Sequence, residues 1–250
     1  MGLGVLLPEA RAVTVATVGD SFADAIYLAL RSRPDLMKKN DVHALRWSRP
    51  VIGLTRTEQF DYAHWLSTEG RPASSAEVCI VQIGSNDMQA IKQDRGWVAF
   101  GSEPWKAIYR QRVNELADLL RGRLCQEVIW ILQPSFERRK YMADRYPVVN
   151  AVQMDALKNK GILVFNITAH GNDYADDDTH FGRDFILKVG DAIFALSSRS
   201  RELHRNTCFT CHEAVPIELV LKAKQELFPL TRCQGQFLRP AVSITIPLGE

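Results

Sequence analysis

The chain of 250 residues is long enough for one sizeable α/β domain, with or without a short appendage. Hydrophobic residues make up 46% of it and charged residues 24%, which is ordinary for a globular protein. The formal net charge of +2 gives no electrostatic reason to expect nucleic acid or a membrane surface as a partner. No apolar run approaches the roughly 20 residues that a transmembrane helix needs, so we expect no transmembrane segment.

The N-terminal residues leave two alternatives open. Residues 2–7 are apolar, and Ala10-Arg11-Ala12 has the small-x-small pattern of a signal-peptidase site. No basic residue precedes this run, however, and it is shorter than the roughly 7–15 residues of a signal core. The chain either begins with a cytoplasmic leader or carries part of a signal peptide whose true start lies upstream. In the second case we expect a periplasmic or exported protein.

The first half of the chain alternates between apolar runs and helix-period segments. Residues 13–18 are rich in β-branched side chains, which is typical of a buried strand. Residues 22–33 are good helix formers, and we expect the helix to stop at Pro34. The same pattern predicts a second strand at 42–47 and a second helix at 57–67.

The alternation continues through the second half. Residues 77–83 form the most apolar strand candidate so far, and a Pro-initiated amphipathic helix runs from Pro104 to Gly122. The remaining predicted elements are a strand at 128–132, a helix at 146–158, a strand at 162–166 and a helix at 185–196.

Five strands that alternate with helices predict an α/β fold with a five-stranded parallel sheet covered on both faces. The strands are apolar throughout, as strands buried in parallel sheets are. Ligands in such folds bind beyond the carboxyl ends of the strands. We therefore expect the functional residues among the polar side chains that follow the strands.

Four short polar motifs stand at these positions. The first strand ends in Gly19-Asp20-Ser21, and the second is followed by Val51-Ile52-Gly53-Leu54. The third ends in Gly84-Ser85-Asn86-Asp87, and Asp177-x-x-His180 comes after the fifth. A serine, a turn glycine, an asparagine and an Asp-x-x-His at one rim are the parts that acyl transfer requires.

Each motif has a chemical role in this hypothesis. Ser21 opens the first helix, where the helix dipole and free N–H groups favour a developing oxyanion. His180 is the candidate base for the Ser21 hydroxyl, and Asp177 is the candidate group that orients the imidazole. The Gly53 N–H, the Asn86 amide and the Ser21 N–H are the candidate oxyanion hole.

Taken singly, these residues have plainer interpretations. Ser21 could be a helix N-cap, Gly53 a turn glycine, and Asn86 a turn or cap residue. His180 could be an ordinary partly buried histidine, and residues 176–178 a solvated acidic loop or a weak cation site. The hypothesis depends on all four motifs occurring in this order, each after a strand.

The set resembles the signature of the SGNH (GDSL-type) hydrolase superfamily over residues 13–197, in a poorly characterised bacterial branch often found as exported proteins. The resemblance implies a flavodoxin-like three-layer sandwich and hydrolysis of short acyl esters, commonly acetyl, with no cofactor. Phe22 departs from the leucine of many relatives. The sequence has no Gly-x-Ser-x-Gly elbow and no Gly-x-Gly-x-x-Gly turn after the first strand, which disfavours the other large Ser-His-Asp family and a dinucleotide site.

We expect a hydrolase domain at 13–198 and a C-terminal extension at 199–250. Cys208-x-x-Cys211-His212 matches a c-type haem attachment pattern. Alternatively, Cys208, Cys211, Cys233 and either His212 or His204 have ligand types suited to zinc. The plainer alternative is a surface extension with free thiols or one disulfide, a short helix at 218–227 and an extra edge strand at 242–246. The remaining cysteines, Cys79 and Cys125, are expected in the core.

The predicted function is a serine esterase that acts through an acyl-enzyme on a small-molecule or saccharide acyl ester. Two alternatives use the same motifs: an O-acyltransferase on envelope saccharides, and a non-catalytic SGNH-like binding module. The loops at 89–103 and 134–147 are expected to shape the pocket. No oligomeric state is predicted.

Overall fold

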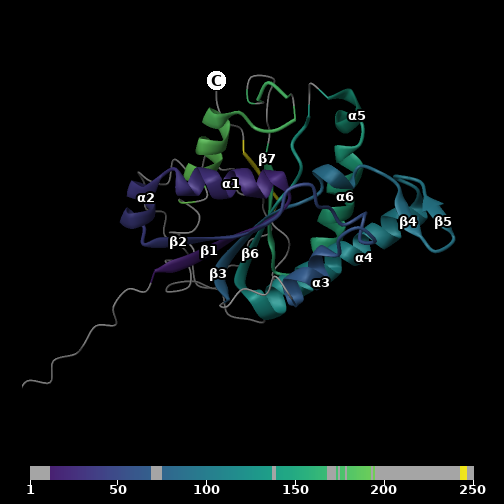
Figure 1. The fold of residues 1–250 in the computed structure, drawn as a ribbon, viewed down its shortest axis with the longest axis horizontal. Helices are drawn as coiled ribbons and strands as arrows, with labels where there is room; N and C mark the ends of the chain where they lie inside the picture. Colours follow the sequence, from purple (N-terminus) through teal and green to yellow (C-terminus); the bar gives the residue numbers. More distant parts are fainter. Residues whose placement is uncertain are drawn as a thin grey trace, which may run out of the picture.

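The core of the protein is one parallel sheet. A computed structural model describes residues 12–68, 75–136, 139–167, 173, 175–177, 179–192, 194 and 243–246. The strand order is β2-β1-β3-β6-β7-β8, and every neighbouring pair is parallel (Figure 1). The strands are β1 (Val13–Gly19), β2 (Val42–Ser48), β3 (Ala76–Gln82), β6 (Cys125–Ile131), β7 (Leu163–Ile167) and β8 (Ser243–Ile246).

Helices cover both faces of this sheet, which confirms the predicted three-layer α/β fold (Figure 1). One layer contains α1 (Ser21–Arg31) and a helix at 183–192, and the other contains α3 (Tyr62–Ser67), α4 (Glu103–Leu119) and α6 (Tyr146–Leu157). The smaller elements are α2 (Pro34–Lys39), the 3₁₀ turn η1 (Ser85–Asp87), the hairpin β4 (Ile91–Gln93) and β5 (Gly96–Val98), the π turn η2 (Leu120–Leu124) and α5 (Lys140–Ala143). No helix in the described ranges is both long and apolar enough to cross a membrane.

The five predicted strands are confirmed to within a few residues, and the pairing of β8 with β7 confirms the extra edge strand. Helix α3 begins at Tyr62 rather than at residue 57, because the Asp61 carboxylate accepts the His64 N–H and caps the helix there. The first helix ends before Pro34, as predicted, and Pro34 is also the first residue of a second short helix, α2. The hairpin and α5 were not predicted.

The prediction that Cys79 and Cys125 lie in the core is confirmed, but a bond between them was not predicted. Both are buried, but their sulfur atoms are bonded at 1.99 Å and join the neighbouring strands β3 and β6. The neighbouring strands β3 and β6 are therefore cross-linked as well as hydrogen-bonded. Disulfides form and persist mainly in oxidising compartments.

The ends of the first three strands meet closely at Gly19. The Gly19 N–H donates to the Tyr62 hydroxyl, which in turn donates to the carbonyl of Trp47 at the end of β2. Gly19 has a φ of +133°, and a Cβ there would lie 1.9 Å from the carbonyl oxygen of Gln82 in β3. Only glycine fits this junction, because it alone tolerates both the positive φ and the close approach of β3.

We predict that Gly19→Ala lowers the free energy of unfolding by about 3 kcal/mol or more, because a methyl group would overlap a backbone atom and the φ is unfavourable. Urea unfolding followed by circular dichroism measures the loss. Gly122→Ala is the matched control, since a Cβ there meets nothing within 4 Å. The control should equal the parent or exceed it by up to about 1 kcal/mol. Equal stability of all three proteins would contradict the junction described here.

Candidate active site

Ser21 is the first residue of α1, and only Asp20 separates it from the end of β1. The N-cap of this helix is Asp20, whose Oδ1 accepts the Phe22 N–H at 3.0 Å. The plainer interpretation of Ser21 as the N-cap is therefore wrong. Its hydroxyl is left for another partner at the positive end of the helix dipole.

The structure brings Ser21, His180 and Asp177 into one hydrogen-bonded chain. The Ser21 Oγ lies 2.9 Å from the His180 Nε2, and the His180 Nδ1 lies 2.5 Å from the Asp177 Oδ2. The other Asp177 oxygen accepts the backbone N–H groups of Thr179 and His180, each at 2.9 Å. The carboxylate therefore orients both the imidazole and the turn that carries it.

Partial burial of Asp177 acts to raise its pKa, but hydrogen bonds from His180 and from two backbone N–H groups lower it to about 2. Asp177 is thus an anion throughout the neutral range. An anionic acceptor at Nδ1 favours the tautomer in which Nε2 is free to accept the Ser21 proton.

Gly53 and Asn86, the other two predicted residues, lie next to each other. A Cβ on Gly53 would come within 3.3 Å of the Asn86 Cβ and 2.4 Å of the Asp87 Oδ1, so this position requires glycine. The Asn86 Nδ2 donates one hydrogen bond, at 2.8 Å, to the Ile52 carbonyl. An amide NH₂ has a second N–H to donate. Asn86 also lines the same pocket as Ser21.

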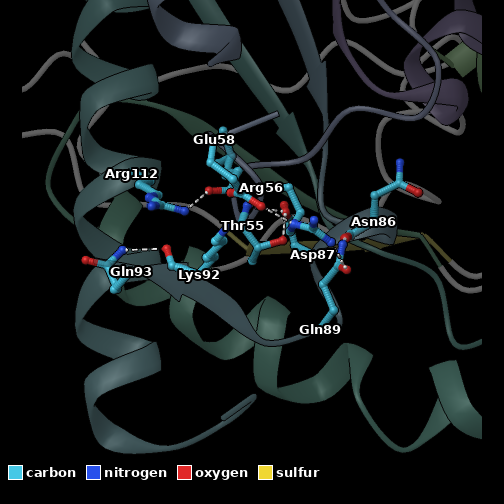
Figure 2. A network of polar contacts seen from close by, with 10 residues as sticks. Thr55, Arg56, Glu58, Asn86, Asp87, Gln89, Lys92, Gln93 and Arg112 are labelled. Carbon is cyan, nitrogen blue, oxygen red and sulfur yellow. Dashed lines mark hydrogen bonds and ion pairs between the residues drawn. The ribbon is translucent and has the colours of Figure 1, made fainter. Parts of the chain in front are cut away.

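The turn that carries Asn86 belongs to a network of polar contacts that includes Thr55, Asp87 and Gln89 (Figure 2). The buried Asp87 carboxylate accepts the Thr55 N–H at 2.8 Å, the Thr55 hydroxyl at 3.0 Å and the Tyr109 hydroxyl at 3.1 Å. Burial raises the pKa of Asp87 above its ordinary value. The Gln89 amide donates to the Asn86 carbonyl and Arg56 donates to Gln89, so the turn is held on two sides.

Asp20 had no predicted role, yet its side chain joins two of the motifs. Its Oδ2 accepts hydrogen bonds from the backbone N–H groups of Gly84 and Ser85, each at 3.2 Å, and from the Ser85 hydroxyl at 2.8 Å. Its other oxygen caps α1 at Phe22. An acidic residue directly between a buried strand and a helix was the available signal, but its distant partners could not be read from it.

Ser21, Asn86 and His180 share one pocket of about 480 Å³. The other lining residues are Phe22, Pro50, Val51, Ser85, Arg139, Tyr141, Met142 and Thr179. Three of them come from the predicted loop at 134–147, but no lining residue comes from the loop at 89–103. Of the two loops predicted to shape the pocket, only the loop at 134–147 contributes described wall residues.

No three His, Cys, Asp or Glu side chains of the described ranges lie together as a metal site would require. The tail motif with Cys208, Cys211, His212 and Cys233 lies outside the described residues, as does His204. The boundary between the predicted domain at 13–198 and the extension also falls outside them and stays a prediction.

Solved structures share this fold. LAE5, an alpha/beta hydrolase enzyme from the metagenome of Lake Arreo, matches with a TM-score of 0.56 and 14% identity over 76% of this chain and 96% of its own. The lipase/acylhydrolase from Enterococcus faecalis matches with a TM-score of 0.50 and 14% identity over 80% of this chain and 100% of its own. An acetyl esterase mutant with acetate ion matches with a TM-score of 0.50 and 12% identity over 75% and 99%. At these identities the likeness shows the fold alone.

The chain belongs to the family described as "Protein of unknown function (DUF459)", whose model matches residues 14–193. This match contains all four motifs and, apart from Val13, five of the six described strands of the parallel sheet. No curated protein matches the chain.

We predict that Asp20→Asn changes how stability depends on pH. Burial raises the pKa of Asp20 from 3.8 to about 6, so the folded state holds this proton more tightly than the unfolded state. The contribution favours folding below pH ~4 and is lost as the pH rises to ~6, a change of about 3 kcal/mol. Asparagine lacks it, so the free energy of unfolding of the variant, relative to the parent, should rise by about 2 kcal/mol between pH 4 and pH 7, since part of the contribution is already lost at pH 4.

Urea titrations at pH 4, 5, 6 and 7 measure this difference. Asp94→Asn, at an exposed position in the hairpin turn, is the control and should follow the pH curve of the parent. Parallel curves for Asp20→Asn and the parent would show that this carboxyl does not titrate in the window.

Proposed function

We propose that the protein is a serine ester hydrolase of the SGNH type, with Ser21 as nucleophile, His180 as base and Asp177 as the group that orients His180. The observation that carries the proposal is the continuous chain from the Ser21 hydroxyl through the imidazole to the Asp177 carboxylate, at the wall of an open pocket. The strand-end position of the site agrees with the general location of ligand sites in parallel α/β folds.

In the proposed reaction His180 removes the proton from the Ser21 hydroxyl as the oxygen attacks the ester carbonyl carbon. The tetrahedral intermediate collapses when His180 gives that proton to the leaving alcohol, and an acyl group remains on Ser21. Water, deprotonated by His180, then attacks the acyl-enzyme, and His180 returns that proton to the Ser21 oxygen as the acid is released. Asp177 stays anionic and stabilises the imidazolium in both steps.

The proposed oxyanion hole consists of the Ser21 and Gly53 N–H groups and the Asn86 amide. The adjacency of Gly53 and Asn86, and the position of Asn86 in the same pocket as Ser21, support this assignment. Removal of one such donor typically costs about 10²–10³ in turnover. Solved structures with this fold include an acetyl esterase and a lipase/acylhydrolase, which supports acyl esters as the substrate class.

We predict that Ser21→Ala and His180→Ala each reduce turnover of 4-nitrophenyl acetate by about 10⁴-fold or more, because each removes a group that acts in bond formation. Steady-state kinetics measures the loss, and a fluorophosphonate probe followed by peptide mapping should label Ser21 in the parent. Ser32→Ala is the matched control at the other end of α1, where the hydroxyl only donates to the Ala29 carbonyl. Undiminished hydrolysis by Ser21→Ala would eliminate the proposed mechanism.

A further inference from the structure

Arg139 is a pocket residue that the proposed triad does not use. It stands just before α5, and its backbone N–H donates to the Phe136 carbonyl at 2.9 Å. Its guanidinium Nε and Nη2 both donate to the backbone carbonyl of Asp177, at 3.2 and 2.6 Å. Two hydrogen bonds to one oxygen fix the guanidinium beside the proposed triad.

The charge of this guanidinium has no counterion among the described residues. Its acceptor is a neutral carbonyl, and the Asp177 carboxylate is bonded to His180 instead. None of the ion pairs between described residues includes Arg139. A guanidinium has five N–H donors, so about three remain after the two bonds to Asp177.

The other described wall residues do not match this charge. Among the described residues that line the pocket, Arg139 alone has a permanently charged side chain. Phe22, Pro50, Val51 and Met142 are apolar, and the hydroxyl and amide residues are neutral. A neutral acyl ester would leave the guanidinium without an ionic partner inside the pocket, whereas a carboxylate or phosphate would pair with it in a fork geometry.

Arg145, the next arginine along the chain, differs from Arg139 in that its guanidinium is held by several contacts within the fold. Arg145 donates to the Met88 carbonyl and to the Tyr141 hydroxyl, and it lies 3.9 Å from the Tyr141 ring centroid and 4.9 Å from that of Phe100. Its guanidinium thus contacts two rings and two oxygens. Arg139 contacts one carbonyl and lies at the pocket wall.

We propose that the pocket selects esters that also carry a carboxylate or phosphate group, and that Arg139 binds this anion. The inference rests on the proposed ester hydrolysis and adds the substrate class. In this proposal the ester carbonyl lies at Ser21, and the anionic group accepts hydrogen bonds from the Arg139 N–H groups that do not donate to the Asp177 carbonyl. The apolar residues contact the carbon skeleton between the two groups.

A matched pair of substrates tests the proposal in the full-length protein. 4-Acetoxybenzoate carries a carboxylate, and methyl 4-acetoxybenzoate is the same ester with that charge removed. We expect the parent to prefer the charged ester in kcat/KM by about 10-fold or more at low salt, and the preference to shrink as salt is raised. Arg139→Gln should abolish the preference, while Arg139→Lys, which keeps the charge, should retain part of it.

The ratio of the two kcat/KM values separates binding from positioning. If Arg139 only positions the Asp177 turn, Arg139→Gln lowers both rates equally and leaves the ratio unchanged, which would overturn the proposal. Arg31→Gln, at an exposed position in the last turn of α1, is the control and should keep the ratio of the parent. Equal rates of the parent on both esters would also overturn the proposal and leave ester hydrolysis intact.

Binding to Ser21→Ala, measured by calorimetry, gives a readout without chemistry. 4-Acetoxybenzoate and 4-acetoxyphenyl phosphate represent the carboxylate and the phosphate, and the tighter ligand identifies which anion the pocket takes. We expect Arg139→Gln in the Ser21→Ala background to lose about 10-fold or more in affinity for that ligand. If the parent hydrolyses none of the esters, the proposed function fails and the inference fails with it.

Discussion

The arrangement of the site depends on the buried carboxylate of Asp20. One oxygen caps α1 at Phe22 and holds Ser21 at the first position of the helix. The other accepts three hydrogen bonds from Gly84 and Ser85, which precede Asn86 in the third motif. A single side chain thus sets the distance between the proposed nucleophile and one proposed oxyanion donor. Burial of this group opposes its ionisation, and the hydrogen bonds offset that cost only in part, as its raised pKa of about 6 shows.

A second buried carboxylate, that of Asp87, connects separate elements in the same way. Asp87 connects the loop after β2, through Thr55, to α4, through the hydroxyl of Tyr109. Gly53 is small because the Asp87 oxygen occupies the space of a side chain. The loop with Gly53 and the turn with Asn86 are therefore positioned by the same carboxylate, since buried polar groups need partners wherever they are placed. The register of the parallel strands aligns their ends, and the two buried carboxylates connect the turns that follow these ends.

The fold could be predicted from the sequence because its strands are continuous apolar runs and its main helices carry clear periodicity and caps. Ser102 caps α4 through the Trp105 N–H, close to the expected start at Pro104. The motif order also brought Ser21 and His180 together in the hypothesis, although they are 159 positions apart. What could not be predicted were contacts that depend on register and on irregular backbone. The Cys79–Cys125 bond needs the alignment of β3 with β6, and the bond from Arg139 to the Asp177 carbonyl needs a loop conformation that no periodicity encodes.

Phe22 links these unpredicted loops to the proposed nucleophile. Its ring centroid lies 5.4 Å from that of His180, 5.0 Å from that of Phe181 and 5.7 Å from that of Phe136. Phe136 belongs to the segment that leads to Arg139, and Phe181 follows His180 directly. The residue next to Ser21 therefore packs against both segments that bring charge to the pocket. The Phe22 ring makes edge contacts with Phe136 and Phe181 and a tilted contact with His180, which a leucine side chain, having no ring, could not make. Phe22 therefore packs both against the segment of the proposed base and against Phe136, three residues before Arg139.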